Sequence, residues 1–567
     1  MKRNFGKILV FMLIMSMLVT SAIYFAEPQD KTATVATDKI EIQADLDKNK
    51  LFDNLEEKLN SSSENDILPV IIVFNEEIDS NKKDLVKKII GDTNPKHEYK
   101  IIPGMAVELT KGQINAISKL DFVKHVEFDM PVYATLDKAT YWYGADKAVT
   151  DFGVTGDRNG SATSYSTTDI VVAVIDTGID AAHVDLDGGK VIAWKDYINN
   201  LTTPYDDNGH GTHCSSIVAG TGEGNSLYKG VASGAALVGV KVLDANGSGS
   251  MSNVTAGIDW VVTNKATYGI EVISLSLGTS GSSDGTDATS LAVNNAVENG
   301  IVCFVAAGNE GPAKYTIGAP GAAANAITVG NMADVGEKGF YLAYSSSRGP
   351  TADGRIKPDI VAPGVNIMAA TANSTNGYQV MSGTSMATPF TAGTAALMLD
   401  ANPNLTPAQI KNTIATTAID WATSGQDIDY GYGRLDAFAA VKLAGNYTTG
   451  TNIAVPAHMY TSGTINTVRK SDYYTFNVTN TSYNINISLI MPNWTGSSTP
   501  DFDIYLYNPS GTQVASGTGS TRQESISFTP TTTGTYKIKV YSYAGTGSYF
   551  FDISAGGSGL VLTGNDL

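Results

Sequence analysis

Four short, almost continuous apolar segments constrain the fold of the middle of this chain more than any other feature. They are residues 170–175 (IVVAVI), 236–242 (ALVGVKV), 272–277 (VISLSL) and 301–306 (IVCFVA). Strands of this kind have no polar side, so both faces of their sheet must be covered, which is typical of a parallel sheet flanked by helices. We therefore predict a doubly wound α/β domain with a mostly parallel sheet over residues 137–445. In such a domain, ligands bind beyond the carboxyl ends of the strands.

The first 26 residues carry an export pattern. Lys2, Arg3 and Lys7 form a basic start, and the 19 residues from 8 to 26 contain no charged side chain. This pattern predicts a cleaved secretory signal over residues 1–26. An uncleaved membrane anchor is the alternative, because the uncharged stretch just reaches spanning length. We expect a secreted, extracellular protein, either free or associated with a cell surface.

Charge and cysteine content exclude several classes of protein. Asp and Glu outnumber Lys and Arg by 56 to 38, which gives a net charge of −18. A nucleic-acid partner is therefore excluded, because nothing would neutralise its phosphates. The two cysteines, Cys214 and Cys303, are too few for a disulfide scaffold or a cysteine-rich zinc protein. Two separate buried thiols are favoured over one disulfide, because both residues fall inside predicted regular elements.

A smaller block precedes the α/β domain. Residues 27–65 are polar and rich in charge, and they predict a mobile lead-in. From residue 66 to 130, strand patterns such as 69–74 (PVIIVF) and 123–128 (VKHVEF) alternate with helical patterns. Such an alternation within so few residues predicts a small α+β unit.

The block after the α/β domain has a different character. Residues 446–555 are rich in Thr, Ser, Tyr and Asn, and segments such as 473–478 (YYTFNV) and 502–507 (FDIYLY) alternate with period two. Turn signals separate these segments, so we predict an all-β sandwich or jelly roll. The tail, residues 556–567, has little to pack.

Two candidate catalytic side chains lie at the expected ligand edge of the sheet. Asp176 directly follows the first apolar strand, and His210 lies in 208–213 (NGHGTH), ahead of an apolar helix. An aspartate at a strand end is often only a turn residue, so Asp176 alone would be structural. Two histidines three residues apart also suit a metal, but no HExxH pattern is present, and His213 is predicted to pack inside the helix.

Two further candidates come from later segments. Ser385 lies in 383–389 (GTSMATP), which opens a long helix, and Asn309 follows the strand at 301–306. A serine at this place is most often a helix cap, yet the same place offers free N–H groups and a positive helix dipole to an oxyanion. Asn309 is either a left-handed turn residue or a hydrogen-bond donor from its side-chain amide.

The chain order Asp176, His210, Asn309, Ser385 makes these motifs meaningful together. The segments VIDTGI, HGTH and GTSMATP, in this order, resemble the three signatures of subtilisin-like serine proteases, the subtilases, over roughly 300 residues. The resemblance implies a serine endopeptidase with Ser385 as nucleophile and His210 as general base. It also implies that Asp176 orients His210 and that Asn309 binds the oxyanion. No cofactor is implied for the chemistry.

The same resemblance places the substrate. It implies that an extended polypeptide pairs with two edge segments and that a first side-chain pocket has a glycine floor. The implied substrate-binding residues are Gly247, Ser248, Gly249, Ser276, Leu277, Gly278, Gly308 and Gly318. An uncharged glycine floor at Gly318 implies large apolar residues before the cut rather than a strict preference for Lys or Arg.

The flanking blocks also resemble parts of exported subtilases. Residues 27–136 resemble the ferredoxin-like propeptide, an intramolecular inhibitor, and we place processing near Leu136, whose side chain suits the apolar pocket. Residues 446–555 resemble the pre-peptidase C-terminal domain. There, Asp501 and Asp503 lie on one face of a strand start and suit a structural Ca²⁺, with a solvated acidic turn as the alternative. Exposed aromatic residues of this domain suit contact with carbohydrate or a cell surface.

Three readings of the whole chain compete. The first is an active, self-processing endopeptidase that acts on many substrates as a monomer. The second is a binding protein built on an inactive protease scaffold, and the third is a maturation protease dedicated to one partner. The presence of all four catalytic candidates favours the first reading, because inactive scaffolds lack one of them. An esterase is excluded, because the chain order differs and no GxSxG elbow is present.

Overall fold

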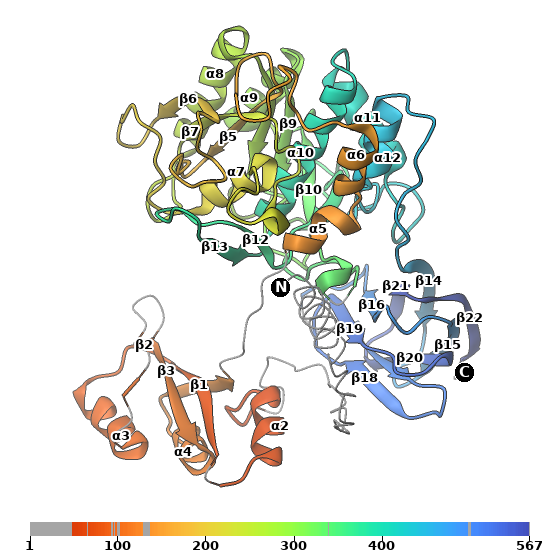
Figure 1. Cartoon of the computed structure of the whole chain (residues 1–567). Coiled ribbons are helices and arrows are strands. Elements are labelled where there is room, and N and C mark those ends of the chain that lie inside the picture. Colours follow the sequence, from red (N-terminus) through yellow and green to blue (C-terminus); the bar gives the residue numbers. More distant parts are fainter. Residues whose placement is uncertain are drawn as a thin grey trace, which may run out of the picture. The chain divides into compact units, whose positions relative to one another are not determined.

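The computed structural model describes residues 48–565, except 65, 92–93, 96, 99–102, 129–135, 338 and 497–499 (Figure 1). The predicted signal, residues 1–26, lies outside the described residues. Within the described part of the chain, no helix has the length and apolar character needed to cross a bilayer.

The first described unit is an antiparallel sheet with helices. Its strand order is β2-β3-β1-β4, and β1 pairs with both β3 and β4. The elements are α2 (Asp53–Ser61), β1 (Ile67–Phe74), α3 (Ser80–Ile90), β2 (His97–Glu98), β3 (Gly104–Thr110), α4 (Lys111–Ile117) and β4 (Val123–Phe128). The expected small α+β unit is therefore present.

This unit begins earlier in the chain than the sequence pattern predicts. Leu51, Leu55 and Leu59 are 7%, 0% and 4% exposed and belong to its apolar core, and Leu51 forms a parallel bridge to Val126. The prediction of a mobile lead-in up to residue 65 is wrong for this stretch. Leu55 and Leu59 are four residues apart on one face of α2, and Leu51 precedes the helix. The burial of all three offsets the polarity of the surrounding residues.

A seven-stranded parallel sheet forms the centre of the next domain (Figure 1). Its order is β11-β10-β9-β8-β5-β7-β6, so β8 to β11 follow one another outward on one side of β5, and β7 and the edge strand β6 lie on its other side. The strands are β5 (Val171–Asp176), β6 (Val191–Asp196), β7 (Ala236–Lys241), β8 (Ile270–Leu275), β9 (Val302–Ala306), β10 (Ile327–Met332) and β11 (Ile360–Pro363). The predicted doubly wound α/β fold is confirmed. The reversal of winding at β5 opens a crevice at the carboxyl ends of the strands.

Helices cover both faces of this sheet. Val172 and Val174 of β5 pack in one cluster with α7 (His210–Ala219) and α10 (Thr384–Ala401). On the other face, Val171, Ala173 and Ile175 pack with α8 (Met251–Tyr268) and α9 (Ala288–Glu298). The remaining elements are α5 (Leu136–Trp142), α6 (Ala145–Phe152), η1 (Ser226–Tyr228), η2 (Val335–Glu337), β12 (Ile367–Ala370), β13 (Tyr378–Met381), α11 (Pro407–Thr417) and α12 (Ala437–Ala444).

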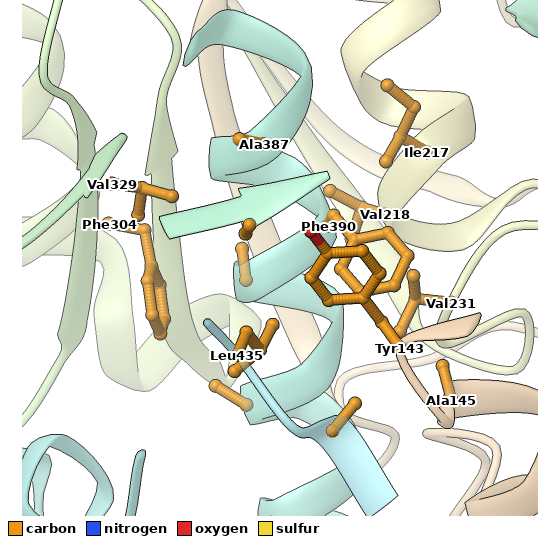
Figure 2. Packing of buried hydrophobic residues seen from close by; sticks show 14 of the residues in the cluster. Tyr143, Ala145, Ile217, Val218, Val231, Phe304, Val329, Ala387, Phe390 and Leu435 are labelled. Atoms are coloured by element: carbon orange, nitrogen blue, oxygen red, sulfur yellow. The ribbon is translucent and has the colours of Figure 1, made fainter. Parts of the chain in front are cut away.

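Helix α10 is buried on all sides. Figure 2 shows Ala387 and Phe390 of this helix next to Ile217 and Val218 of α7 and near Tyr143. A helix with no solvent-facing side is held in place along its whole length, because a tightly packed interior resists displacement. The N-terminal end of α10, which carries Ser385, is therefore rigidly placed.

Two antiparallel sheets form the C-terminal domain, and their orders are β14-β21-β16-β19 and β18-β17-β20-β15-β22. The strands are β14 (Ala457–Ile465), β15 (Ser471–Val478), β16 (Ile485–Ile490), β17 (Asp501–Tyr507), β18 (Gln513–Gly517), β19 (Gln523–Phe528), β20 (Gly534–Ala544), β21 (Gly547–Ala555) and β22 (Gly557–Asn565). Alternate residues such as Phe502, Ile504 and Leu506 fill the core between the sheets. The predicted all-β domain is confirmed.

The end of the chain is more ordered than its composition indicates. Residues from Gly557 onward form β22, which pairs antiparallel with β15. The prediction of a tail with little to pack is therefore wrong. Most side chains of β22 are exposed, and the strand is held through backbone hydrogen bonds, which leave no hydrophobic pattern in the sequence.

Both cysteines are free and buried. The prediction of two separate thiols, rather than a disulfide, is confirmed.

Candidate active site

Asp176 and His210 meet at the carboxyl edge of the parallel sheet. Asp176 ends β5 with its side chain 1% exposed, and His210 is the first residue of α7. Nδ1 of His210 lies 2.7 Å from Oδ1 of Asp176, and the backbone N–H of Thr177 donates to the same oxygen at 2.7 Å. This contact fixes the orientation of the ring and leaves its Nε2 available for proton transfer.

The electrostatics of this pair favour the imidazolium. Burial opposes a charge on His210, but the carboxylate of Asp176 outweighs it, so the pKa of His210 is raised well above its usual value of 6.5. In contrast, burial lowers the pKa of His213 to about 3. His213 packs inside α7 with its Nε2 at 3.0 Å from the carbonyl of Ile367, so the prediction of a packed helix residue is confirmed.

A polar loop holds the start of α7 against β5. The hydroxyl of Thr177 donates to Asp206 Oδ1 at 3.0 Å and accepts from the N–H of Gly211 at 2.8 Å. Asp206 Oδ2 accepts from the N–H of Thr212 at 2.9 Å. The segment before His210 is thus tied to the residue after Asp176, so the two catalytic candidates cannot move independently.

Ser385 is the second residue of α10, at the positive end of the helix dipole. Its hydroxyl donates to the carbonyl of Ser276 at 3.2 Å, and its own carbonyl accepts from the Ser276 hydroxyl at 2.8 Å and from Cys214 Sγ at 3.3 Å. Transfer of the Ser385 proton to His210 therefore requires a rotation of the hydroxyl. Such loose geometry is common before substrate binds.

Asn309 is oriented by the same helix start. Its Oδ1 accepts from the N–H of Thr384 at 3.0 Å and from the hydroxyl of Thr384 at 3.3 Å. Because both donors lie at Oδ1, the amide nitrogen Nδ2 is free to donate to another acceptor. Gly308, whose N–H donates to the Thr384 hydroxyl at 3.3 Å, has a φ of +105°, a conformation that suits glycine.

A pocket beside Ser385 has the predicted glycine. Gly318 lines it together with Gly308, Asn309 and the segment 277–280. A Cβ on Gly318 would lie 2.0 Å from the carbonyl oxygen of Thr279, so no other residue fits there without a backbone shift. Among the lining residues that the sequence interpretation missed, one is charged: Glu310, whose Oε2 accepts from the N–H of Gly281 at 2.7 Å. Glu310 directly follows Asn309 in the sequence, and this adjacency could have identified it as a residue of the same pocket.

A second cavity extends the cleft on the other side of His210. Gly247, Ser248 and Gly249 line it, as do Ser276, Leu277 and Gly278. Leu243, Met251 and Val254 add apolar surface to the same cavity. The structure thus places the two predicted edge segments along one continuous cleft.

Comparison with known proteins agrees with this site. The model of the subtilase family matches residues 167–433. Serine protease AprX of Bacillus subtilis (strain 168) is 37% identical over 365 residues, which cover 60% of this chain and 80% of that protein. Subtilisin E of the same organism is 31% identical over 366 residues (64% and 86%), and an alkaline protease of Shouchella clausii is 33% identical over 350 residues (61% and 81%).

The chain belongs to the subtilase family. It is a serine protease of the subtilisin type. This subtilase has an N-terminal propeptide, because residues 47–113 match the Tk-SP N-propeptide domain. Residues 470–542 match the bacterial pre-peptidase C-terminal domain.

The predicted processing residue lies at the start of the subtilase domain. Leu136 is the first residue of α5, and residues 129–135 before it lie outside the described residues. Ala139 and Tyr143 are buried in the core that also contains α7 and α10. From Ala139 onward the chain is therefore part of the catalytic domain.

The C-terminal domain of the subtilase contains a second group of buried carboxylates. Asp501 and Asp503 are 6% and 5% exposed, so a solvated acidic turn is excluded, and Glu524, which the sequence interpretation missed, is 5% exposed. Within the described residues, Asp501 Oδ1 and Glu524 Oε1 have no hydrogen-bond partner. Burial, together with the charge of Asp503, raises the pKa of Asp501 to about 6. Burial is also the main cause that raises the pKa of Glu524 to about 8.

Within the described residues, one cluster of potential metal-ligating atoms includes Asp176 and His210. Ligand atoms of Asp176, His210 and Cys214 lie within 4.8 Å of one another. Burial raises the pKa of the Cys214 thiol, which therefore stays protonated and donates to the carbonyl of Ser385. A metal ion here would replace the hydrogen bond between His210 and Asp176, so we assign no resident metal to this cluster.

Proposed function

We propose that this subtilase is a secreted endopeptidase, made as a self-processing zymogen, with Asp176, His210 and Ser385 as its catalytic triad. The observation that carries the proposal is the 2.7 Å contact between His210 and Asp176 at the end of β5, together with the place of Ser385 in the first turn of α10. Asn309, with its amide nitrogen free beside this helix start, supports the same chemistry.

The proposed reaction proceeds through an acyl-enzyme. The Ser385 oxygen attacks the scissile carbonyl carbon while His210 Nε2 takes the hydroxyl proton, and Asp176 stabilises the imidazolium that forms. The negative oxygen of the tetrahedral intermediate accepts from Asn309 Nδ2 and from the N–H of Ser385. His210 then gives its proton to the leaving amine. Water, activated by the same histidine, hydrolyses the ester and restores Ser385.

The cleft suits an extended peptide. The edges at Gly247–Gly249 and Ser276–Gly278 offer backbone groups to a substrate strand, and the pocket above Gly318 takes the residue before the cut. We propose that large apolar residues are preferred there. The carboxylate of Glu310 at the same pocket adds tolerance of Lys at that position.

The propeptide gives the zymogen its inhibitor. We propose that residues 27–136 fold separately and occupy the cleft, and that the enzyme cuts its own chain near Leu136. The start of α5 at this residue and the burial of Ala139 support a boundary just before the catalytic core.

The experiment is self-processing, followed by intact mass. The chain without residues 1–26 is compared with its Ser385→Ala variant and with Ser424→Ala, a control at an exposed serine. The wild type and the control are expected to lose about 110 N-terminal residues, which is the span from 27 to 136, and Ser385→Ala is expected to stay intact. If the mass of none of the three proteins changes and no peptide is hydrolysed, the proposal is replaced by the hypothesis of a binding protein on an inactive protease scaffold. Hydrolysis of a single protein from a complex mixture would instead favour a dedicated maturation protease.

We further propose a structural Ca²⁺ in the C-terminal domain, held by Asp501, Asp503 and Glu524. Three buried carboxylates repel one another when they are ionised, a bound cation relieves this repulsion, and oxygen ligands suit calcium. The ion would stabilise the β-domain and would take no part in peptide hydrolysis.

The outer face of the sheet containing β17 and β20 is proposed to contact carbohydrate or another cell-surface polymer. Lys537 lies over the rings of Tyr473 and Tyr507 at 5.8 and 4.6 Å, and Lys539 lies over Tyr505 at 5.3 Å. Such rings suit stacking with sugars.

Since one chain contains all proposed catalytic residues, we expect a monomer. Export through residues 1–26 completes the proposal.

A further inference from the structure

A buried lysine beside the active site has no role in the chemistry described above. Lys241 is the last residue of β7, and its side chain is 0% exposed. Its ammonium group donates to the carbonyl of Thr177, to Asp207 Oδ1 at 2.6 Å and to the carbonyl of Leu243 at 2.9 Å. An ammonium has three N–H donors, so these three acceptors fill its capacity.

The three acceptors belong to three functional segments. Thr177 follows Asp176, and Asp207 lies three residues before His210. Leu243 lines the cleft and leads into the substrate edge at Gly247–Gly249. One side chain therefore joins the two triad-bearing segments to the edge that binds the peptide.

Backbone contacts make this junction continuous with the sheet. The N–H groups of Val242 and Leu243 donate to the carbonyl of Asp176 at 2.9 and 3.2 Å. The backbone of Asp176 and the start of the substrate edge are therefore already in contact. Lys241 adds the loop of His210 to this contact through Asp207, whose side chain is 35% exposed.

The charge of Lys241 makes the junction rigid. A buried ammonium persists only where its oxygen acceptors remain in place, because water cannot replace them. The ring of Tyr205, whose centroid is 5.1 Å from the ammonium, covers a further side of it. A shift of any one of the three segments would leave the cation with an unsatisfied donor.

We propose that Lys241 is a positioning residue that couples the peptide-binding edge to the Asp176–His210 pair, so that extended substrates are cut faster than short ones. The inference rests on the proposed peptidase function. A peptide that pairs with the edge at 247–249 fixes the position of the segment that Lys241 contacts through Leu243. The same ammonium group contacts Asp207 and Thr177, so their positions are fixed together with that segment.

The test compares two substrates on the mature enzyme. One is a tetrapeptide anilide that ends in Phe and reaches the edge, and the other is a single-residue Phe anilide that does not. Competent sites are counted with a fluorophosphonate that labels the reactive serine. Per labelled site, Lys241→Met is expected to lower the ratio of the two kcat/KM values about tenfold, mainly through kcat on the tetrapeptide. Asp207→Asn, which keeps an oxygen acceptor but removes the charge, is expected to lower it less.

A matched control separates this role from general stability. Lys195 on neighbouring β6 also lies over a tyrosine, Tyr197, at 4.8 Å, and it forms none of the three contacts of Lys241. Lys195→Met is expected to leave the ratio unchanged. Loss of stability alone lowers the number of labelled sites and leaves the ratio unchanged, so an unchanged ratio in Lys241→Met overturns the proposal. If that variant does not fold, an unchanged ratio in Asp207→Ala overturns it. A wild-type enzyme that takes no label contradicts the peptidase function itself.

Discussion

Buried carboxylates occur in both the catalytic domain and the C-terminal domain, and they differ in what balances them. Asp176, 1% exposed, has His210 at 2.7 Å. Asp501 and Glu524 are almost as buried, yet neither forms an ion pair with a cationic side chain in the described part of the chain. Asp176 thus has a cationic partner within the protein, whereas the partner proposed for the C-terminal group is Ca²⁺.

The architecture of the two domains explains this difference. In the parallel sheet, the end of β5 faces the starts of α7 and α10, so a carboxylate at a strand end meets side chains from helices. In the antiparallel sandwich, Asp501 and Glu524 come from strands of the two different sheets, and no helix supplies a counter-charge. The first arrangement suits catalysis, and the second suits binding of a cation.

The largest effect is expected from a substitution that removes the contact between Asp176 and His210. Asp176→Asn should lower kcat about 10⁴-fold, because the histidine loses the carboxylate that orients it and stabilises its charge. Asp503→Asn in the other group should leave kcat unchanged. Both are measured on a tetrapeptide anilide per fluorophosphonate-labelled site, and equal losses in the two variants would contradict the distinction between the groups.

The next largest expected effect is the dependence of activity on pH, which the pair of His210 and Asp176 determines. Because the pKa of His210 is raised, kcat/KM should increase with pH, with a midpoint above 6.5, since the imidazolium present at lower pH has no free Nε2 to accept a proton. Below the midpoint the rate should fall about tenfold per pH unit. His213, with a pKa of about 3, stays neutral over this range. A midpoint below 6.5 would show that burial outweighs Asp176.

Calcium should stabilise the C-terminal domain through its buried carboxylates. At a concentration of Ca²⁺ a hundredfold above its Kd, the C-terminal domain gains about 3 kcal/mol, which raises its Tm by about 10–20 °C relative to a chelator. Glu524→Gln should remove most of this increase, and Glu298→Gln, at an exposed residue, should retain it. Calorimetry of the Ser385→Ala protein avoids self-digestion. Equal melting curves with calcium and with chelator would leave the buried carboxylates without a cation.

The smallest expected effect concerns a carboxylate that is exposed. Glu310 borders the first pocket, and water screens its charge, so Glu310→Gln should lower the preference for Lys relative to Phe before the cut by only about two- to fivefold. The ratio of kcat/KM for two matched anilides measures it. A much larger change would mean that a bound Lys side chain removes Glu310 from water.

The sequence predicts much of the catalytic domain, because its signals are local. Each apolar strand is a contiguous run, and Asp176, His210 and Ser385 each lie at the boundary of such an element. The edges of the other domains are less visible. The helix at Asp53–Ser61 is polar on average, and β22 is held mainly by backbone pairing, so neither has a strong pattern.

The order of the elements, the class of each domain and the identity of the catalytic candidates could all be predicted from the amino-acid sequence. Only the tertiary structure showed that Thr384 orients the side chain of Asn309 through hydrogen bonds, and that Glu310 borders the first pocket. It also showed that Glu524 lies near Asp501 and Asp503. It alone showed the three contacts of Lys241. These facts depend on contacts between residues distant in the chain, and a side chain's partners there are set by packing, which no local pattern records.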